Sequence, residues 1–134
     1  MREIEKEIVG EMKSTEAIRA DVLDSFDYEY PERDVELNIS TEEFTSVCPK
    51  SGLPDFGTIR INYLPDKKCV ELRSWKFYLM SYRHVGIFHE HVVNRILEDF
   101  VAAVEPKRAT VFGDFTIRGG VHTTSKVSWE KKSS

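Results

Sequence analysis

Alternating apolar and polar positions predict the strands of this chain. Residues 57–65, GTIRINYLP, alternate at every second position, which is the pattern of a half-buried strand. The polar PDKK that follows predicts a turn, and residues 69–72 are predicted to return as the second strand of a hairpin. Shorter or later strands are predicted at 35–40, 109–117 and 121–129. The paired glycines of RGG permit a tight turn between the last two.

Apolar residues at three- and four-residue steps predict two helices between these pairs of strands. The first covers 74–83, with Ser74 as its N-cap, and the second covers 87–104 and ends before Pro106. The order is therefore β-β-α-α-β-β. It predicts an α+β fold in which a four-stranded antiparallel sheet carries both helices on one face.

The N-terminal part of the chain has a weaker pattern. Residues 1–24 space their apolar side chains like one or two helical turns, but Gly10 interrupts them. We therefore expect an N-terminal arm over 1–40 and one folded domain over 41–134. A sheet of four strands leaves two open edges that invite pairing with another chain, so we expect a homo-oligomer with sheets joined edge to edge.

Composition and charge narrow the class of protein. The 134 residues are 40% hydrophobic and 31% charged, which is typical of one globular domain. A net charge of −4 gives no basic footprint for nucleic acid, and no apolar run approaches the roughly 18–20 residues of a membrane span. Two cysteines, Cys48 and Cys69, without CxxC spacing argue against a disulfide scaffold or a structural zinc site. We expect a reduced, cytoplasmic protein with no metal and no membrane or nucleic-acid partner.

Cys48 is the first candidate for chemistry. It lies in SVCPKSGLPD, a segment rich in Pro, Gly and Ser where no packing pattern demands a buried apolar residue. A thiol with its ordinary pKa near 8.5 is only slightly ionised at neutral pH, and Lys50 is close enough in sequence to favour the thiolate. Most free cysteines are inert core residues, and we assign that role to Cys69.

Asp55 follows seven residues later. It is either an ordinary turn aspartate or a proton donor beside the thiolate, and the second role requires burial or a negative neighbour. His89 and Glu90 open the second helix. His89 and His91 do not share a helix face, which disfavours a metal site. Glu90 either complements the helix dipole or accepts hydrogen bonds from the N–H edge of a planar base.

The stretch ELRSWKFYLMSYR, residues 71–83, breaks the amphipathic pattern with four charges. Its first part, ELRSWKFY, is similar to a motif of the NADPH-dependent 7-cyano-7-deazaguanine reductases, the nitrile reductases of queuosine biosynthesis. Arg73 stands where that family usually has lysine, and it keeps the positive charge. FTSVCPKSGLPDF, SYRHVGIFHE and FTIRGG are similar to further segments of the family in the same order, so the resemblance covers roughly residues 42–122. More narrowly, the chain resembles the single-module form of the family.

The resemblance implies a set of roles. Cys48 would form a thioimide with the substrate's nitrile carbon, and Asp55 would supply protons. Two NADPH molecules per turnover would each give a hydride. The substrate pocket implied by the resemblance consists of Val70, Glu71, Leu72, His89 and Glu90, and the cofactor site consists of Leu72, Arg73, Ser74, Lys76, Arg118 and Gly119.

The same resemblance implies the tunnelling fold, in which oligomeric barrels are built from such sheets. It suggests a decamer of two facing pentamers with active sites between subunits. A related amidinotransferase acting on the deazaguanine nitrile in tRNA and a non-catalytic purine- or pterin-binding ring protein remain alternatives. The NADPH motif disfavours the first, and the joint presence of Cys48, Asp55 and Glu90 disfavours the second.

Overall fold

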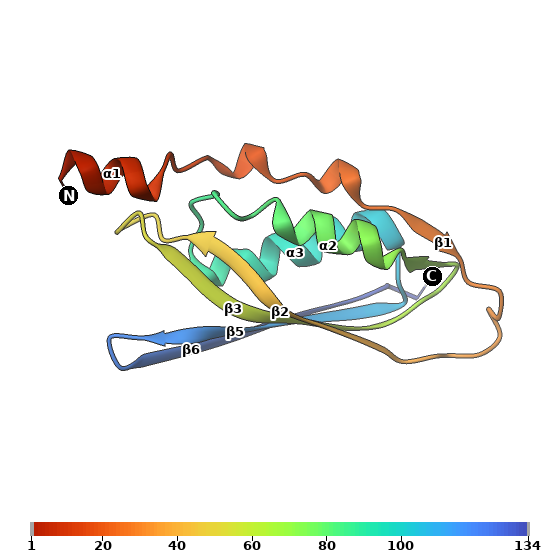
Figure 1. Cartoon of the computed structure of the whole chain (residues 1–134). Helices are drawn as coiled ribbons and strands as arrows, with labels where there is room; N and C mark the ends of the chain where they lie inside the picture. Colours follow the sequence, from red (N-terminus) through yellow and green to blue (C-terminus); the bar gives the residue numbers. More distant parts are fainter. Residues whose placement is uncertain (1, 134) are drawn as a thin grey trace.

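A computed structural model describes residues 2–133 and shows a sheet with a helical layer on one face (Figure 1). The sheet contains, in spatial order, β2 (Leu37–Val47), β3 (Pro54–Leu64), β5 (Arg108–Arg118) and β6 (Val121–Glu130), all antiparallel. The covering helices are α2 (Leu72–Met80) and α3 (His89–Val104). The predicted α+β class and the order of the main elements are confirmed. Within residues 2–133, β2 and β6 form the edges of the sheet, and no helix there is both long and apolar enough to cross a membrane.

Side-chain alternation decides which face of the sheet the helices cover. On β3, Asp55, Gly57, Ile59, Ile61 and Tyr63 are buried, and the residues between them are more exposed. The helices present a matching apolar stripe, which on α3 consists of Val92, Val93, Ile96, Leu97, Phe100 and Val104. Each such side chain contributes roughly 1.5–3 kcal/mol when it leaves water. The core between sheet and helices therefore holds the two layers together.

One predicted pairing is wrong. Residues 57–65 and 69–72 do not form a hairpin, because β3 pairs with β2 on one side and with β5 on the other. The short strand β4 (Lys68–Val70) pairs instead with β1 (Ser25–Asp27). Both edges of β3 are already occupied, so the chain leaves the sheet after Leu64. The first hairpin of the sheet is the one closed by the Cys48 loop.

The first helix also starts earlier than predicted. Glu71, not Ser74, is the N-cap of α2, and its carboxylate accepts from the backbone N–H of Arg73 (2.5 Å) and of Ser74 (3.0 Å). Ser74 lies inside the first turn, where its hydroxyl donates to the Glu71 carbonyl at 2.7 Å. By contrast, the turn at RGG is confirmed, since Gly119 and Gly120 adopt φ of 58° and 78°.

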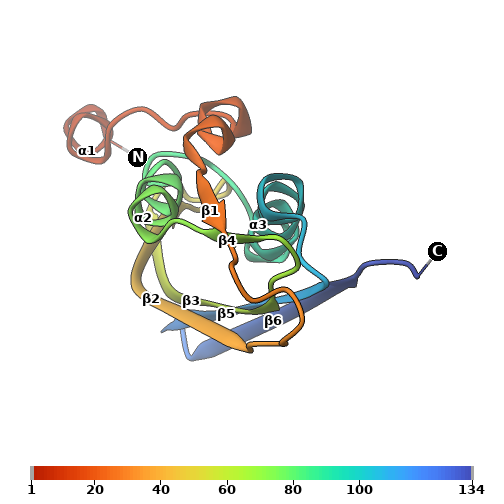
Figure 2. The same cartoon turned by 90° about the vertical axis from the view of Figure 1, so that its right-hand side faces the viewer.

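The N-terminal segment runs over the helical layer, on the side away from the sheet (Figure 2). It contains α1 (Glu3–Val9), two short 3-10 helices, η1 (Thr15–Ala17) and η2 (Ala20–Val22), and then β1. Its second half is fastened to both ends of α2: the N–H of Asp24 donates to the Ser74 hydroxyl, and the N–H of Arg19 donates to the Ser81 hydroxyl, each at 3.0 Å. The Ile18 side chain enters the core. This segment therefore braces α2.

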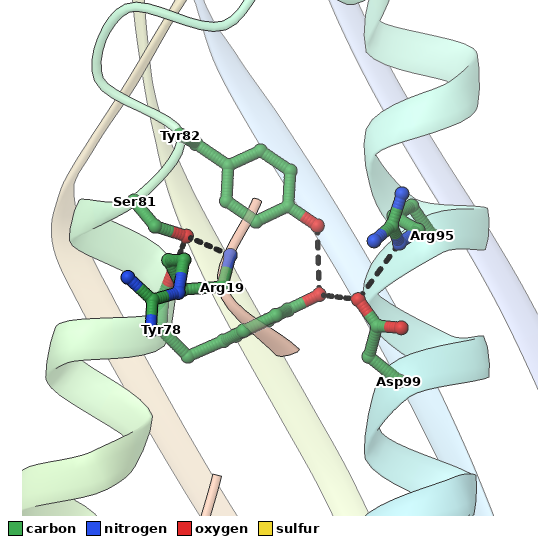
Figure 3. Close-up of polar contacts among 6 residues, drawn as sticks. All are labelled: Arg19, Tyr78, Ser81, Tyr82, Arg95 and Asp99. Atoms are coloured by element: carbon green, nitrogen blue, oxygen red, sulfur yellow. Dashed lines mark hydrogen bonds and ion pairs between the residues drawn. The ribbon is translucent and has the colours of Figure 1, made fainter. Parts of the chain in front are cut away.

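A buried polar cluster links α2 to α3 (Figure 3). The Tyr78 hydroxyl donates to Asp99 Oδ2 at 2.6 Å and lies 2.7 Å from the Tyr82 hydroxyl. Arg95 Nε donates to the same Asp99 oxygen at 2.8 Å. Burial, above all, raises the pKa of both tyrosines, so they stay neutral. The cluster fixes the relative position of the two helices through satisfied polar groups.

Candidate active site

Cys48 begins the loop that joins β2 to β3. Its N–H donates to the Leu53 carbonyl at 2.9 Å, and its own carbonyl accepts from the N–H of Gly52 at 2.8 Å. Gly52 has φ of 75°, which an L side chain rarely adopts, so the glycine permits this tight loop. Cys48 is half-buried, whereas Cys69 is buried on β4. The loop thus holds one thiol at the molecular surface in a defined conformation.

The surroundings of Cys48 favour its thiolate. The Ser51 hydroxyl makes the largest contribution to lowering the pKa of Cys48, and the backbone N–H groups of Ser51 and Lys50 add to it. Burial and the negative charge of Asp55 oppose this effect. Lys50 contributes to this lowering through its backbone N–H, and the effect that we expected from its ammonium group stays a prediction. The loop stabilises the thiolate with hydrogen-bond donors.

Asp55 lies at the start of β3 and is 8% exposed. Its Oδ1 is 2.8 Å from Arg118 Nη1, and Arg118 also donates to the Pro54 carbonyl. Its Oδ2 is 3.2 Å from His89 Nε2, a distance within range of an ion pair although the two atoms are not aligned as a hydrogen bond. The structure therefore supplies the burial, one of the two conditions that we set for a proton donor, and it adds a cation, Arg118, beside the carboxylate.

His89 owes its position to an aromatic platform. Its ring lies flat on the ring of Phe115, with centroids 3.8 Å apart and planes at 4°. Phe115 is buried between Gly57 and Gly113, where an added Cβ would come within 2.9 Å and 2.8 Å of the Phe115 ring. A side chain at either glycine would displace Phe115 and with it the imidazole. These three residues were missed from sequence, although a glycine inside a strand often marks such a close approach.

Glu90 occupies the first turn of α3 and is exposed. Within residues 2–133 its carboxylate forms no ion pair or side-chain hydrogen bond, whereas its backbone carbonyl accepts from Asn94 Nδ2 at 2.8 Å. The acidic side chain next to His89 is therefore available to an incoming donor. Cys48, Asp55, His89, Glu90, Arg118 and Gly119 all belong to one end of the molecule.

The remaining predicted site residues lie elsewhere. The N–H of Val70 donates to the Tyr63 hydroxyl at 3.1 Å, and Tyr63 is eight residues beyond Asp55 on β3. At about 3.3 Å per residue, this places Val70 roughly 26 Å from Asp55 along the strand. Figure 1 shows β4 and the start of α2 at the end of the molecule opposite the loop between β2 and β3. Val70, Glu71, Leu72, Arg73 and Ser74 are therefore not brought together with Cys48 within one chain.

Helix α2 carries Arg73 and Lys76, two of the residues expected to bind NADPH, and Arg83 follows the end of the helix. Arg73, Lys76 and Arg83 are exposed and form no ion pair with any carboxylate in residues 2–133. Lys76 and Arg83 line a groove of about 270 Å³ between α2 and the edge strand β2. The guanidinium of Arg73 lies 5.3 Å from the Phe77 ring centroid. Uncommitted cations beside a groove fit the phosphate groups of NADPH, so this face suits the expected cofactor.

Comparisons with known proteins identify the family of this chain. The family model described as QueF-like protein matches residues 54–134, which include Asp55, His89 and Glu90. The NADPH-dependent 7-cyano-7-deazaguanine reductase of Chlorobaculum tepidum is 51% identical over 111 residues, covering 83% of this chain and 95% of that protein. The enzyme of the same name from Elusimicrobium minutum is 55% identical over 100 residues, covering 75% of this chain and 76% of that protein.

A solved structure also matches. The crystal structure of the archaeosine synthase QueF-Like in the apo form has a TM-score of 0.63 and 27% identity, and the match covers 71% of this chain and 91% of that one. The fold and the level of identity to the reductases agree. The chain belongs to the family of NADPH-dependent 7-cyano-7-deazaguanine reductases.

Proposed function

We propose that this protein reduces the nitrile of 7-cyano-7-deazaguanine to the primary amine of 7-aminomethyl-7-deazaguanine through a thioimide on Cys48. The activity follows from family membership and belongs to queuosine biosynthesis. The observation that carries the Cys48 assignment is a half-buried thiol with a lowered pKa beside a buried carboxyl group. We place the enzyme in the cytoplasm, where reduced thiols persist.

In the first step, the Cys48 sulfur adds to the nitrile carbon. A carbon–sulfur bond forms, one π bond of the nitrile breaks, and the nitrogen takes up a proton. NADPH, when bound, supplies one hydride in each of two rounds, so that two NADPH and two protons, the first of them included, convert the nitrile to the neutral amine. After the first hydride, the carbon–sulfur bond breaks as an imine forms, which regenerates the Cys48 thiolate. The imine then receives the second hydride.

Asp55 is the proposed source of the protons. It lies in the same end of the molecule as Cys48, and its side chain is 11% exposed. Arg118 and His89 hold its two oxygens on opposite sides, which fixes the direction in which the carboxyl group points. A positioned general acid typically contributes about 10²–10⁴-fold to a rate.

Glu90 is proposed to hold the deazaguanine ring, since its exposed carboxylate can accept two hydrogen bonds from the N–H edge of a planar base. We proposed the same role for His89 from the sequence. Its contact with Asp55 adds a second task, because it ties the proton donor to the helix that carries Glu90. Val70, Glu71 and Leu72 are proposed to complete the pocket.

The separation of the two groups of residues supports a homo-oligomer in which each active site is shared. In this proposal, one subunit contributes Cys48, Asp55, His89 and Glu90, and a neighbour contributes the start of α2. The open edges of β2 and β6 provide surfaces for joining sheets, and two facing pentamers are the proposed assembly. In this assembly, Arg118 and Gly119 would contact the cofactor from the subunit that contributes Cys48.

The test is mass spectrometry of the protein with 7-cyano-7-deazaguanine alone, followed by NADPH consumption in the complete reaction. We expect an adduct of one substrate mass on the peptide containing Cys48, and two NADPH oxidised per amine formed. An adduct on another residue would contradict the Cys48 assignment. Turnover driven by ammonia or glutamine without loss of NADPH would place the protein with amidinotransferases, a class the match to an archaeosine synthase makes worth testing.

A further inference from the structure

The hydroxyl of Ser46 is a buried polar group that the proposed mechanism does not use. Ser46 lies on β2, two residues before Cys48, and its side chain is fully buried. Within residues 2–133 its Oγ has no hydrogen-bond partner. Burying a hydroxyl without a partner is unfavourable, so an apolar side chain would suit this position better if packing were its only task.

The register of the sheet places Ser46 beside Asp55. The two residues are directly opposite each other on β2 and β3. Phe44, two residues earlier on β2, packs its ring 5.3 Å from Tyr82 and so identifies the inner face of the strand. Ser46 and Asp55 share that inner face, and opposite residues in an antiparallel pair have Cβ atoms about 4.5–5.5 Å apart. The Ser46 hydroxyl is therefore a near neighbour of the Asp55 carboxyl group.

The cationic neighbour of Asp55, Arg118, suits only the ionised form of the carboxyl group. Arg118 from β5 is a donor and a fixed cation, and His89 from α3 presents a ring nitrogen. Cys48 from the adjoining loop brings a thiolate, and β2 contributes no titratable group opposite Asp55. Once Asp55 carries a proton, its O–H needs an acceptor, and arginine has none to offer.

We propose that Ser46 is a positioning residue that accepts the hydrogen bond of protonated Asp55. The unused lone pairs of its Oγ hold the acid form in place between the two reduction rounds, when Asp55 must be reloaded with a proton. A hydrogen bond to the neutral form favours that form. Ser46 thereby gives the acid form of Asp55 an acceptor that Arg118 cannot supply. The inference rests on the proposed role of Asp55.

The experiment compares Ser46→Ala with Ser125→Ala. Ser125 on β6 is a matched control, because its Oγ is also buried and unpartnered within residues 2–133 but lies two strands away from β3. Both variants remove an unsatisfied hydroxyl, so both are expected to keep or raise Tm. Only Ser46→Ala is expected to lower kcat, by about tenfold near neutral pH, and to move the basic limb of the kcat profile about one unit toward lower pH.

Ser46→Thr provides the second variant, since it keeps the hydroxyl and is expected to keep the pH profile. A wild-type profile in Ser46→Ala would overturn the proposal, and so would equal losses in the Ala and Thr variants, which would indicate packing alone. Mass spectrometry of the Cys48 adduct separates this failure from that of the proposed function. If the wild-type protein forms the adduct, the function stands and only the role of Ser46 falls.

Discussion

The two ends of this molecule are built in different ways. At the Cys48 end, the reactive groups hold one another: Asp55 is fixed by Arg118 and His89, and His89 lies on Phe115. At the start of α2, Arg73 and Lys76 are exposed and form no ion pair within residues 2–133, whereas Glu71 caps the helix. One end is thus fixed by contacts within the chain, and the other presents exposed cations, which we propose to bind the cofactor.

We propose that this difference separates the tasks of the active site. A fixed geometry lowers the activation free energy of a reacting group, because the group does not have to be ordered during the reaction. A cofactor that must enter and leave twice in each turnover gains from accessible charges that bind phosphate without a deep enclosure. The comparison therefore predicts that substitutions at the two ends affect different kinetic quantities.

The largest effect is expected from removing the nucleophile. Cys48→Ala should lower kcat at least about a thousandfold, because no other group can form the thioimide. The absorbance change that accompanies adduct formation should disappear as well. Cys69→Ala is the control, since Cys69 is a buried residue of β4, and this variant should retain the absorbance change. An absorbance change that persists in Cys48→Ala would show that another residue is the nucleophile.

The second largest effect is expected from removing the exposed cations of α2. The double change Arg73→Ala and Lys76→Ala should raise KM for NADPH by about 10–100-fold, since two phosphate-binding cations are lost. Adduct formation on Cys48 should proceed at the wild-type rate, because it needs no cofactor. Lys126→Ala, an exposed cation on β6, is a matched control. A double variant that loses adduct formation but keeps the wild-type KM for NADPH would contradict the proposal that α2 binds the cofactor and the Cys48 end forms the adduct.

Much of this division could be foreseen from sequence. The residues of the Cys48 end were predicted individually, and the alternation in β3 and the spacing in α3 predicted the elements that carry them. Their mutual contacts were not predictable, because Gly57, Gly113 and Phe115 come from two strands that meet only in the folded sheet. The prediction of a hairpin between residues 57–65 and 69–72 was wrong because it also depended on strand pairing in the folded sheet. Local turn signals do not reveal that β2 occupies one edge of β3.

A smaller effect, on thermal stability, is expected from the polar cluster that joins α2 to α3. Tyr78→Phe removes the hydroxyl that joins α2 to Asp99 on α3, and a hydrogen bond to a charged group contributes about 1.5–3 kcal/mol. Asp99 keeps Arg95 as a partner, so the expected loss of unfolding free energy is at the lower limit of this range. It corresponds to a fall of a few degrees in Tm. Calorimetric unfolding measures it. A wild-type Tm would show that the cluster in Figure 3 does not brace the helices.

The smallest effect concerns the pKa of Cys48. Because the Ser51 hydroxyl makes the largest contribution to lowering that pKa, Ser51→Ala should raise it toward its ordinary value. The acidic limb of the rate of adduct formation should move to higher pH by less than about one unit, with no change at pH values where both proteins are fully ionised. A shift toward lower pH would contradict the assigned cause. Stopped-flow absorbance across a pH series provides the measurement.

The central claim is that one chain contains two halves of different active sites. The most direct test co-expresses Cys48→Ala with the Arg73→Ala and Lys76→Ala variant under two affinity tags and purifies oligomers that carry both. At low NADPH, Cys48→Ala alone should not reduce the nitrile, and the Arg73→Ala and Lys76→Ala variant alone should reduce it about 10–100-fold more slowly than the wild type. In the mixed oligomer about a quarter of the sites should combine an intact Cys48 end with an intact α2, so activity should reach about that fraction of the wild type. Doubly tagged oligomers with no activity above that of the parents would contradict a shared site.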